Sequence, residues 1–181
     1  MMHSKGDSSY SNKNSECDVL TFMPDENAEI IKKLEKINFD DEELSNNYQS
    51  IDWYEYKCIT VLLKNEEILG FSSVWHRPKY YGSDEVRILN RYWEHKKLRM
   101  YGAELARPHL ISTIMHQLKY SKYFGFKKAF ISREKNYRVM KKLIAEIQNK
   151  TNTQWTMDNK KVCICVPESP SCWQYKGETL L

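Results

Sequence analysis

Three closely spaced apolar runs in the middle of the chain have the length and composition of β-strands. The runs at 57–64 and 68–77 are separated by the polar sequence NEE, which predicts an antiparallel hairpin. The third run, at 86–95, has large side chains at both odd and even positions. A strand of this kind is covered on both faces, and we therefore expect it near the centre of a sheet.

Three other segments repeat apolar residues at the spacing of amphipathic helices. They lie at 24–37, 103–120 and 136–150. In the second segment, Pro108 fits the first turn of a helix, where its missing N–H is not needed, so we expect the helix core to begin near Arg107. In the third segment, the residues expected to face the core are Val139, Met140, Leu143, Ile144 and Ile147.

The order of these elements is that of a single α/β domain with a mixed sheet. Short strands are expected at 17–23, before the first helix, and at 125–134, between the second helix and the third. Another strand should end at Val166, and residues 171–181 form either a last strand or an irregular tail. A helix that connects two strands of one sheet makes a crossover, which predicts that the strand at 86–95 runs parallel to the next one.

The amino-acid composition is typical of a soluble protein, and the chain length is that of a single domain. The 181 residues are 41% hydrophobic, and no apolar run approaches the roughly 18 residues that a membrane-spanning helix needs. The first 16 residues are polar and lack the apolar segment of a secretory signal. We expect a flexible tail at 1–16, one domain at 17–181, a cytoplasmic location and no membrane partner.

Five cysteines are present, an odd number that in a cytoplasmic protein argues against a disulfide framework. Cys163, Cys165 and Cys172 offer thiolates, for which zinc has affinity. However, a Cys-x-Cys pair in a strand places both side chains on one face, which suits small buried residues equally well. The chain also lacks the usual Cys-x-x-Cys spacing, so we expect no metal site.

The sequence LRMYGAE, at 98–104, stands at the start of the second expected helix. A glycine at such a point allows the backbone to approach a bound group closely, and a helix N-terminus presents unpaired N–H donors to phosphate. This loop and the order of elements make residues 17 to about 175 resemble the GNAT-type N-acyltransferases. The resemblance implies a mostly antiparallel sheet with helices on both faces, in which a central parallel pair, 86–95 and 128–133, splays apart at its carboxyl ends.

In that family, acetyl-CoA enters between the splayed strands and donates its acyl group to an amine. Its pyrophosphate is held by a loop of pattern Q/R-x-x-G-x-G/A, which Arg99 and Gly102 match at the first and fourth positions. Glu104 occupies the sixth position, where its charge opposes a pyrophosphate. The same glycine also suits a simple turn before a helix. The resemblance assigns cofactor binding to Leu98, Arg99, Met100, Tyr101, Gly102 and Ala103.

A second match to the family opens the last expected helix. Asn136 stands where the family commonly has Asn, and the resemblance adds it to the acetyl-CoA site, although an Asn here is equally suited to be an N-cap. Seven residues on, where the family usually has Tyr as general acid for the leaving thiolate, this chain has Leu143. Tyr137 is nearby in sequence but would point elsewhere, so the usual acid is absent.

Acyl transfer also needs a base, because the amine must lose a proton before it attacks. Glu94 and His95 close the central strand beside the expected cofactor entrance, and adjacent strand residues face opposite sides, so at most one points into the cleft. The carboxyl end of the neighbouring strand supplies further candidates in Ser132, Arg133 and Glu134. The candidate catalytic residues are therefore Glu94, His95 and Ser132.

Three functions are consistent with these residues. The first is an acyl-CoA-dependent N-acyltransferase, with acyl-CoA and an amine acceptor as partners. The alternative is a GNAT-shaped protein that modifies or binds nucleic acid without acetyl-CoA, because stretches such as YSKYFGFKK mix aromatic and basic residues. A third is a non-catalytic interaction module. A positive face would favour the nucleic-acid alternative, and its residues would be Lys96, Lys97, Lys127 and Lys128.

Overall fold

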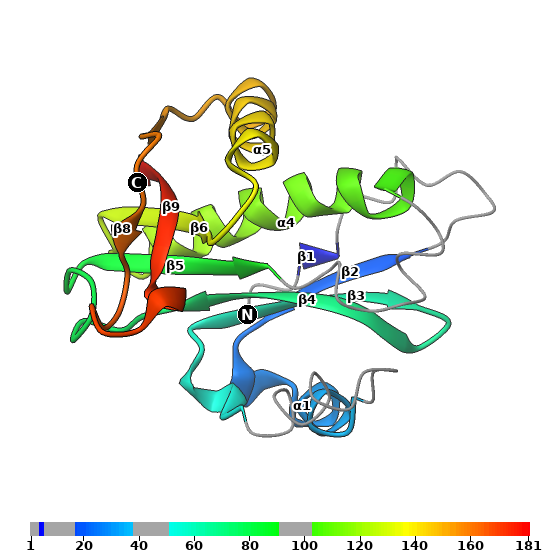
Figure 1. Cartoon of the computed structure of the whole chain (residues 1–181). Coiled ribbons are helices and arrows are strands. Elements are labelled where there is room, and N and C mark those ends of the chain that lie inside the picture. Colours follow the sequence, from blue (N-terminus) through cyan, green and yellow to red (C-terminus); the bar gives the residue numbers. More distant parts are fainter. Residues whose placement is uncertain (1–3, 6–16, 38–50, 91–102) are drawn as a thin grey trace. The chain divides into compact units, whose positions relative to one another are not determined.

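A computed structural model describes residues 4–5, 17–37, 51–90 and 103–181 of the chain (Figure 1). The described part is a mixed α/β fold whose sheet is mostly antiparallel and contains one parallel pair of strands. This confirms the fold class expected from the sequence. Two compact units make up the chain, residues 1–73 with 90–116, and residues 74–89 with 117–181.

The strands of the first unit lie in the order β1-β2-β3-β4. Their bounds are Ser4–Lys5 for β1, Asp18–Phe22 for β2, Cys58–Lys64 for β3 and Glu67–Trp75 for β4, which continues into the second unit. β2 is antiparallel to β3, and the buried hydroxyls of Thr21 and Thr60 form a hydrogen bond of 2.9 Å across them. β1, which lies within the segment expected as a tail, pairs antiparallel with β2.

A two-residue turn, Asn65–Glu66, joins β3 to β4 and confirms the hairpin expected from the sequence. Both residues have positive φ, 49° at Asn65 and 64° at Glu66, which gives a tight hairpin the twist of its strands. Asn tolerates this left-handed conformation well, whereas Glu adopts it less readily. The third residue of the polar NEE sequence, Glu67, already belongs to β4.

The first helix, α1, spans Ala28–Glu35 and follows a short 3-10 helix, η2, at Pro24–Glu26. Asn27 caps α1, because its side-chain oxygen accepts a hydrogen bond of 3.2 Å from the N–H of Ile30. The apolar stripe expected from the sequence is buried at Ile30, Ile31 and Leu34. A further 3-10 helix, η3, spans Trp53–Glu55.

The long helix α4 spans Ala103–Tyr123 and passes from the first unit into the second. It begins before the expected start near Arg107, so Pro108 lies in the second turn. The expectation was wrong because a proline inside a helix removes a single backbone hydrogen bond, and a long helix with a buried stripe tolerates that loss. The buried stripe itself is confirmed at Leu110, Ile111, Ile114 and Leu118. No described helix is long and apolar enough to cross a membrane.

The strands of the second unit lie in the order β5-β6-β9-β7, and β8 pairs with β9 beside this path. Their bounds are Glu85–Asn90 for β5, Lys128–Arg133 for β6, Trp155–Met157 for β7, Val162–Cys163 for β8 and Trp173–Leu180 for β9. β9 pairs antiparallel with all of β6, from Lys128↔Leu180 to Arg133↔Tyr175. Of the two alternatives for residues 171–181, the strand is therefore confirmed.

The helix α5 spans Tyr137–Thr151 and packs on β9. Its buried residues are Met140, Ile144 and Ile147. At Gly177 of β9, an added Cβ would meet the side chains of Ile144 and Met140, so helix and strand approach as closely as a glycine allows. Val139, expected to face the core, is 51% exposed. That prediction was wrong because the buried stripe follows the spacing i, i+4, i+7, and Val139 lies on its flank.

Candidate functional site

β5 and β6 run parallel, and their pairing stops halfway along both strands. The paired residues are Glu85↔Lys128, Val86↔Ala129 and Arg87↔Phe130. Beyond the last pair each strand continues, to Asn90 in β5 and to Arg133 in β6, without pairing to the other. The parallel pair therefore separates toward its carboxyl ends, as the resemblance to the GNAT-type enzymes implies.

Most of the candidate residues lie outside the described residues. These are Glu94, His95, Leu98, Arg99, Met100, Tyr101 and Gly102, while Ala103 is the first residue of α4. Their roles stay predictions. Of the lysines expected to form a positive face, Lys96 and Lys97 also lie outside the described residues. Lys128 is described, and its ammonium lies 3.6 Å from the carboxylate of Glu178.

Two candidate residues that are described lie at the carboxyl end of β6. The hydroxyl oxygen of Ser132 is buried and has no hydrogen-bond partner within the described part of the chain. Asn136 precedes α5 in the left-handed conformation, with φ 64° and ψ 55°, and its side chain does not cap the helix. The carbonyl of Asn136 instead accepts the N–H groups of Val139 and Met140. The alternative of a plain side-chain N-cap is therefore not realised.

Tyr137, the tyrosine nearest in sequence to the position of the family's acid, packs toward β9. The centre of its ring lies 5.2 Å from that of Tyr175, and the two ring planes are inclined by 55°. Leu143, at the position of the acid, lies half-buried on α5 and has no proton to donate. The ring of Tyr137 therefore contacts β9.

One face of β5, β6 and β9 carries a set of polar side chains that we did not predict from the sequence. Paired residues share a face, so Arg87 lies on the side of Phe130, and Ser132 on the side of Lys176. We call this set the polar face, and its members are Glu85, Arg87, Lys128, Ser132, Gln174, Lys176 and Glu178. Alternating polar residues, at 85 and 87 in β5 and at 174, 176 and 178 in β9, are the signal that could have identified it.

Ion pairs connect the two lysines of the polar face with its two carboxylates. Lys176 Nζ lies 2.7 Å from Glu85 Oε1 and 3.5 Å from Glu178 Oε2. Lys128 Nζ lies 3.6 Å from the same oxygen, Oε2 of Glu178. Arg87 Nη2 donates a hydrogen bond to Oε1 of Gln174, at 3.5 Å.

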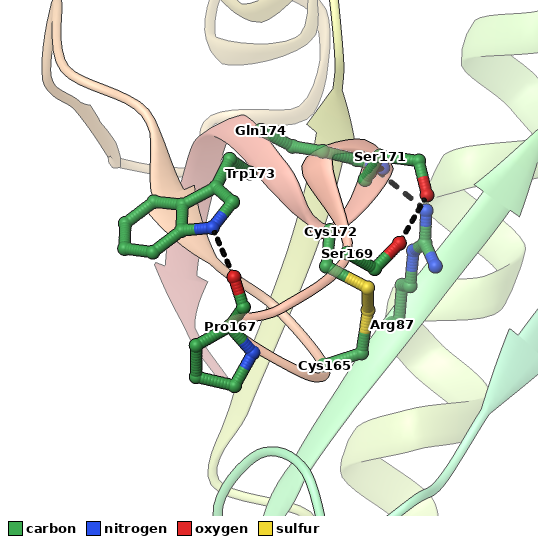
Figure 2. The surroundings of a disulfide bond; sticks show 8 residues. All are labelled: Arg87, Cys165, Pro167, Ser169, Ser171, Cys172, Trp173 and Gln174. Carbon is green, nitrogen blue, oxygen red and sulfur yellow. Dashed lines mark hydrogen bonds between the residues drawn. A yellow bond between two sulfur atoms is a disulfide. The ribbon is translucent and has the colours of Figure 1, made fainter.

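A disulfide between Cys165 and Cys172 closes the loop that leads into β9 (Figure 2). The two Cα atoms are 5.4 Å apart, within the range that such a bond spans. The expectation of no disulfide was wrong, because β8 ends at Cys163 and the chain then turns back through the 3-10 helix η5, Pro170–Cys172. The bond also uses two of the three thiols considered for zinc, and Cys163 is the free one.

Gln174 connects this disulfide-closed loop to Arg87. Its Nε2 donates to the carbonyl of Ser171 at 2.8 Å, while its Oε1 accepts the hydrogen bond from Arg87. The hydroxyls of Ser169 and Ser171 are joined by a hydrogen bond of 2.9 Å. Figure 2 shows Arg87 reaching from β5 toward this loop. The loop therefore orients the amide that contacts the guanidinium.

Burial changes the acidity of two cysteines and one histidine. It raises the pKa of the Cys58 thiol well above its usual range, and it is the largest cause of the raised pKa of Cys17. Both thiols are therefore protonated at neutral pH, and neither is a nucleophile there. Burial lowers the pKa of His109 on α4, because it disfavours the charged imidazolium.

The amino-acid sequence matches no protein-family model and no curated protein. The structure, in contrast, is similar to solved acetyltransferases. One, an acetyltransferase of the GNAT family from Staphylococcus aureus Mu50, has a TM-score of 0.52 and 9% sequence identity, covering 92% of this chain and 99% of that chain. Another GNAT-family acetyltransferase, from Streptococcus pneumoniae, has a TM-score of 0.50 and 11% identity, covering 92% of this chain and 100% of that chain. At these identities the similarity concerns the fold, and the chain has the GNAT fold.

Proposed function

We propose that this protein is an acyl-CoA-dependent N-acyltransferase that moves an acetyl group from acetyl-CoA to an amine. The observation that carries the proposal is the parallel pair β5–β6, whose pairing ends at Arg87↔Phe130. A strand edge without a partner presents unpaired N–H and C=O groups. An extended ligand with amide groups, such as the pantetheine arm, can bind along such an edge in place of a strand. The similarity in fold to solved acetyltransferases supports the same function.

The pyrophosphate is assigned to the loop 98–103. α4 begins at Ala103, so this loop leads directly into the N-terminus of a helix of 21 residues. The first N–H groups of such a helix have no intrahelical partner, and the helix dipole adds a partial positive charge. Arg99 supplies a full positive charge, and Gly102 permits close approach of the backbone. Glu104, in the first turn, opposes the phosphate.

Bound acetyl-CoA supplies the thioester that the amine attacks. Glu94 or His95 takes the proton from the acceptor ammonium, directly or through a water molecule. Ser132 and Asn136 bring a hydroxyl and an amide to the carboxyl end of β6, where both can hydrogen bond a ligand. Ser132 stays a candidate catalytic residue of this proposal, and its hydroxyl can donate a hydrogen bond to a bound ligand.

Calorimetric titration with acetyl-CoA tests the assignment of the loop. Gly102→Ala should weaken binding about ten-fold, which is roughly 1.4 kcal/mol, because a Cβ obstructs the approach of the backbone to phosphate. Glu104→Gly should strengthen binding, because it removes a like charge beside the phosphate. Gly82→Ala is the matched control, since a Cβ there meets no atom nearer than 3.4 Å.

Release of the CoA thiol, measured with acetyl-CoA and a panel of amines, tests the transfer itself. A wild-type protein that binds no acetyl-CoA, together with a Glu104→Gly variant that does not recover binding, contradicts the proposal. Salt-sensitive binding of nucleic acid would then be the assay to run. The cytoplasmic location expected from the sequence stays a prediction of this proposal.

A further inference from the structure

The loop that the Cys165–Cys172 disulfide closes has little apolar packing of its own. We call residues 165–172 the disulfide loop. Of the six residues between the two cysteines, five are exposed to solvent and Ser169 is half-buried. A segment with few buried apolar contacts opens locally at a low cost in free energy. The covalent bond is therefore the principal constraint on the conformation of this loop.

One end of the disulfide is open to reaction with a thiol. Cys165 is half-buried, whereas Cys172 is only 7% exposed. A thiolate reduces a disulfide by attacking one of its sulfurs, and access to that sulfur is one of the factors that set the rate. Attack is therefore directed to Sγ of Cys165, and Cys172 is the leaving thiolate.

Breaking this bond leaves the rest of β9 in place. β9 pairs with β6 from Lys128↔Leu180 to Arg133↔Tyr175, and Gly177 packs against α5. The stabilisation that a disulfide gives by closing a loop decreases as the loop becomes shorter, and these cysteines are only 7 residues apart. Both the oxidised and the reduced chain should therefore fold, which a reversible switch requires.

The disulfide loop leads directly into β9 and is hydrogen-bonded to its first two side chains. Trp173 Nε1 donates to the carbonyl of Pro167 at 3.0 Å, and Gln174 Nε2 donates to the carbonyl of Ser171 at 2.8 Å (Figure 2). These acceptors keep their positions only while the loop keeps its conformation. A loop released from its disulfide therefore loosens the start of β9.

The start of β9 supports the two described candidate residues at the carboxyl end of β6. Lys176 pairs with Ser132, and the preceding Tyr175 pairs with the last residue of β6. The ring of Tyr175 also lies 5.2 Å from that of Tyr137, which directly follows Asn136. A change at the start of β9 therefore reaches both β6 and the beginning of α5.

From these observations we propose that the Cys165–Cys172 disulfide is a reversible redox switch that is reduced by a dithiol and controls binding of acyl-CoA at the carboxyl end of β6. The oxidised form, in which the start of β9 is ordered, is the form of higher affinity. The identity of the ligand as acyl-CoA rests on the proposed N-acyltransferase function. The switch itself is a property of the disulfide loop and β9.

Reduction proceeds in two exchange steps. One thiol of the dithiol, as a thiolate, bonds to Sγ of Cys165, and the bond to Cys172 breaks, leaving a thiolate there that takes up a proton. The second thiol of the reductant, as a thiolate, attacks the reductant sulfur of this mixed disulfide and releases Cys165 as a thiolate, which also takes up a proton. The protein disulfide thus gains two electrons and two protons, and the dithiol becomes a disulfide.

Thiol counting tests whether the switch operates in the folded protein. The native chain is incubated with dithiothreitol, quenched with acid, freed of reductant and alkylated in denaturant for mass spectrometry. We expect five alkylated cysteines after reduction, and three again after treatment of the reduced native chain with oxidised glutathione. A disulfide that resists dithiothreitol until the protein unfolds, or that does not form again, overturns the proposal.

Hydrogen exchange locates the response independently of acetyl-CoA. Reduction should speed the exchange of the backbone amides at 173–176 about ten-fold or more, while the amides of β3 serve as the internal reference. Cys165→Ser/Cys172→Ser should exchange like the reduced protein and ignore dithiothreitol. Cys163→Ser is the matched control, because it removes the neighbouring free thiol and should keep the full response. Equal exchange in the oxidised and reduced wild type overturns the switch.

Calorimetric titration with acetyl-CoA separates this proposal from the proposed function. The oxidised protein should bind about ten-fold more tightly than the reduced protein, which is kept under nitrogen after removal of the reductant. If neither form binds acetyl-CoA but the exchange rates respond, the N-acyltransferase function is refuted and the redox switch of β9 stands. If both forms bind equally, control of the site is overturned and the proposed function stands.

A folding control completes the experiment. Circular dichroism and the unfolding temperature show whether the reduced protein and each variant are folded. Should Cys165→Ser/Cys172→Ser fail to fold, reduced wild type makes the same comparison without a substitution. Global unfolding of the wild type on reduction would assign the disulfide a purely structural role and overturn the switch.

Discussion

The ammonium group of Lys176 reaches across a whole strand to the carboxylate of Glu85. Lys176 is on β9 and Glu85 on β5, with β6 between them in the strand order, and their charged atoms are 2.7 Å apart. The same ammonium lies 4.5 Å from the centre of the Phe130 ring on β6. The ion pair and the contact with Phe130 together link three strands of the second unit. Glu85 is only 7% exposed, so its carboxylate is sheltered from water.

Replacing Lys176 by Met should lower the free energy of unfolding by about 2 kcal/mol, because the buried carboxylate of Glu85 loses its counter-charge. Urea denaturation measures the change. Lys150→Met is the matched control, since its ion pair with Glu146, at 3.2 Å on α5, is solvent-exposed and contributes only about 0.5 kcal/mol. Equal losses in the two variants would show that the Lys176–Glu85 pair has no special role.

Gly177→Ala should destabilise the protein by about 1–3 kcal/mol, because the new Cβ would collide with Ile144 and crowd Met140. The double variant Gly177→Ala/Ile144→Val removes the colliding methyl group and should recover part of the loss. Gly82→Ala, where the nearest atom is 3.4 Å away, should be nearly neutral. If both glycine substitutions have the same effect in thermal unfolding, α5 is not pressed against β9 as described.

Thiol labelling should count three free cysteines in the unfolded protein without reductant and five with it. The double variant Cys165→Ser/Cys172→Ser should lower the free energy of unfolding by about 2 kcal/mol, which is the loop-closure entropy expected for so short a loop. Cys163→Ser should leave it nearly unchanged, because this thiol is unpaired. Labelling of all five without reductant would show that the disulfide does not form.

His109 should make stability depend on pH under mildly acidic conditions. Burial lowers its pKa below the usual 6.5, so the unfolded chain binds a proton at a higher pH than the folded chain does. The free energy of unfolding is therefore unaffected well above pH 6.5 and falls as the pH drops from 6.5 toward the folded-state pKa. His109→Gln should flatten this part of the profile, measured by urea unfolding over a pH series. An unchanged slope would assign the dependence to other groups.

The sequence was sufficient to predict the elements whose apolar residues repeat at the spacing of a strand or a helix. The hairpin at β3–β4 required only two apolar runs and a polar turn, and the parallel pair β5–β6 followed from the long helix between the strands. The inward stripe of α5 was correct at Met140, Ile144 and Ile147, and failed at Val139 on its flank.

Alternation along each strand can mark the polar residues of that strand, but which of them meet on the polar face depends on which strands become neighbours, and no local pattern encodes that. Glu85 and Lys176 are far apart in the sequence, and the order β5-β6-β9 brings them together. Cys165 and Cys172 are close in sequence, but their pairing depends on the turn that follows β8. Of the candidate site, Glu94 through Gly102 lies outside the described residues, so the assignments there remain hypotheses.

β9 comes after both β6 and β7 in the sequence, yet it lies between them in the sheet. During translation, β6 and β7 therefore leave the ribosome before the strand that will separate them has been made. In that interval each has an unsatisfied edge, and unpaired strand edges are the sites at which nascent chains associate wrongly with one another. Slow synthesis between Met157 and Trp173 would prolong this exposure, and chaperones that shield strand edges would have their greatest effect there.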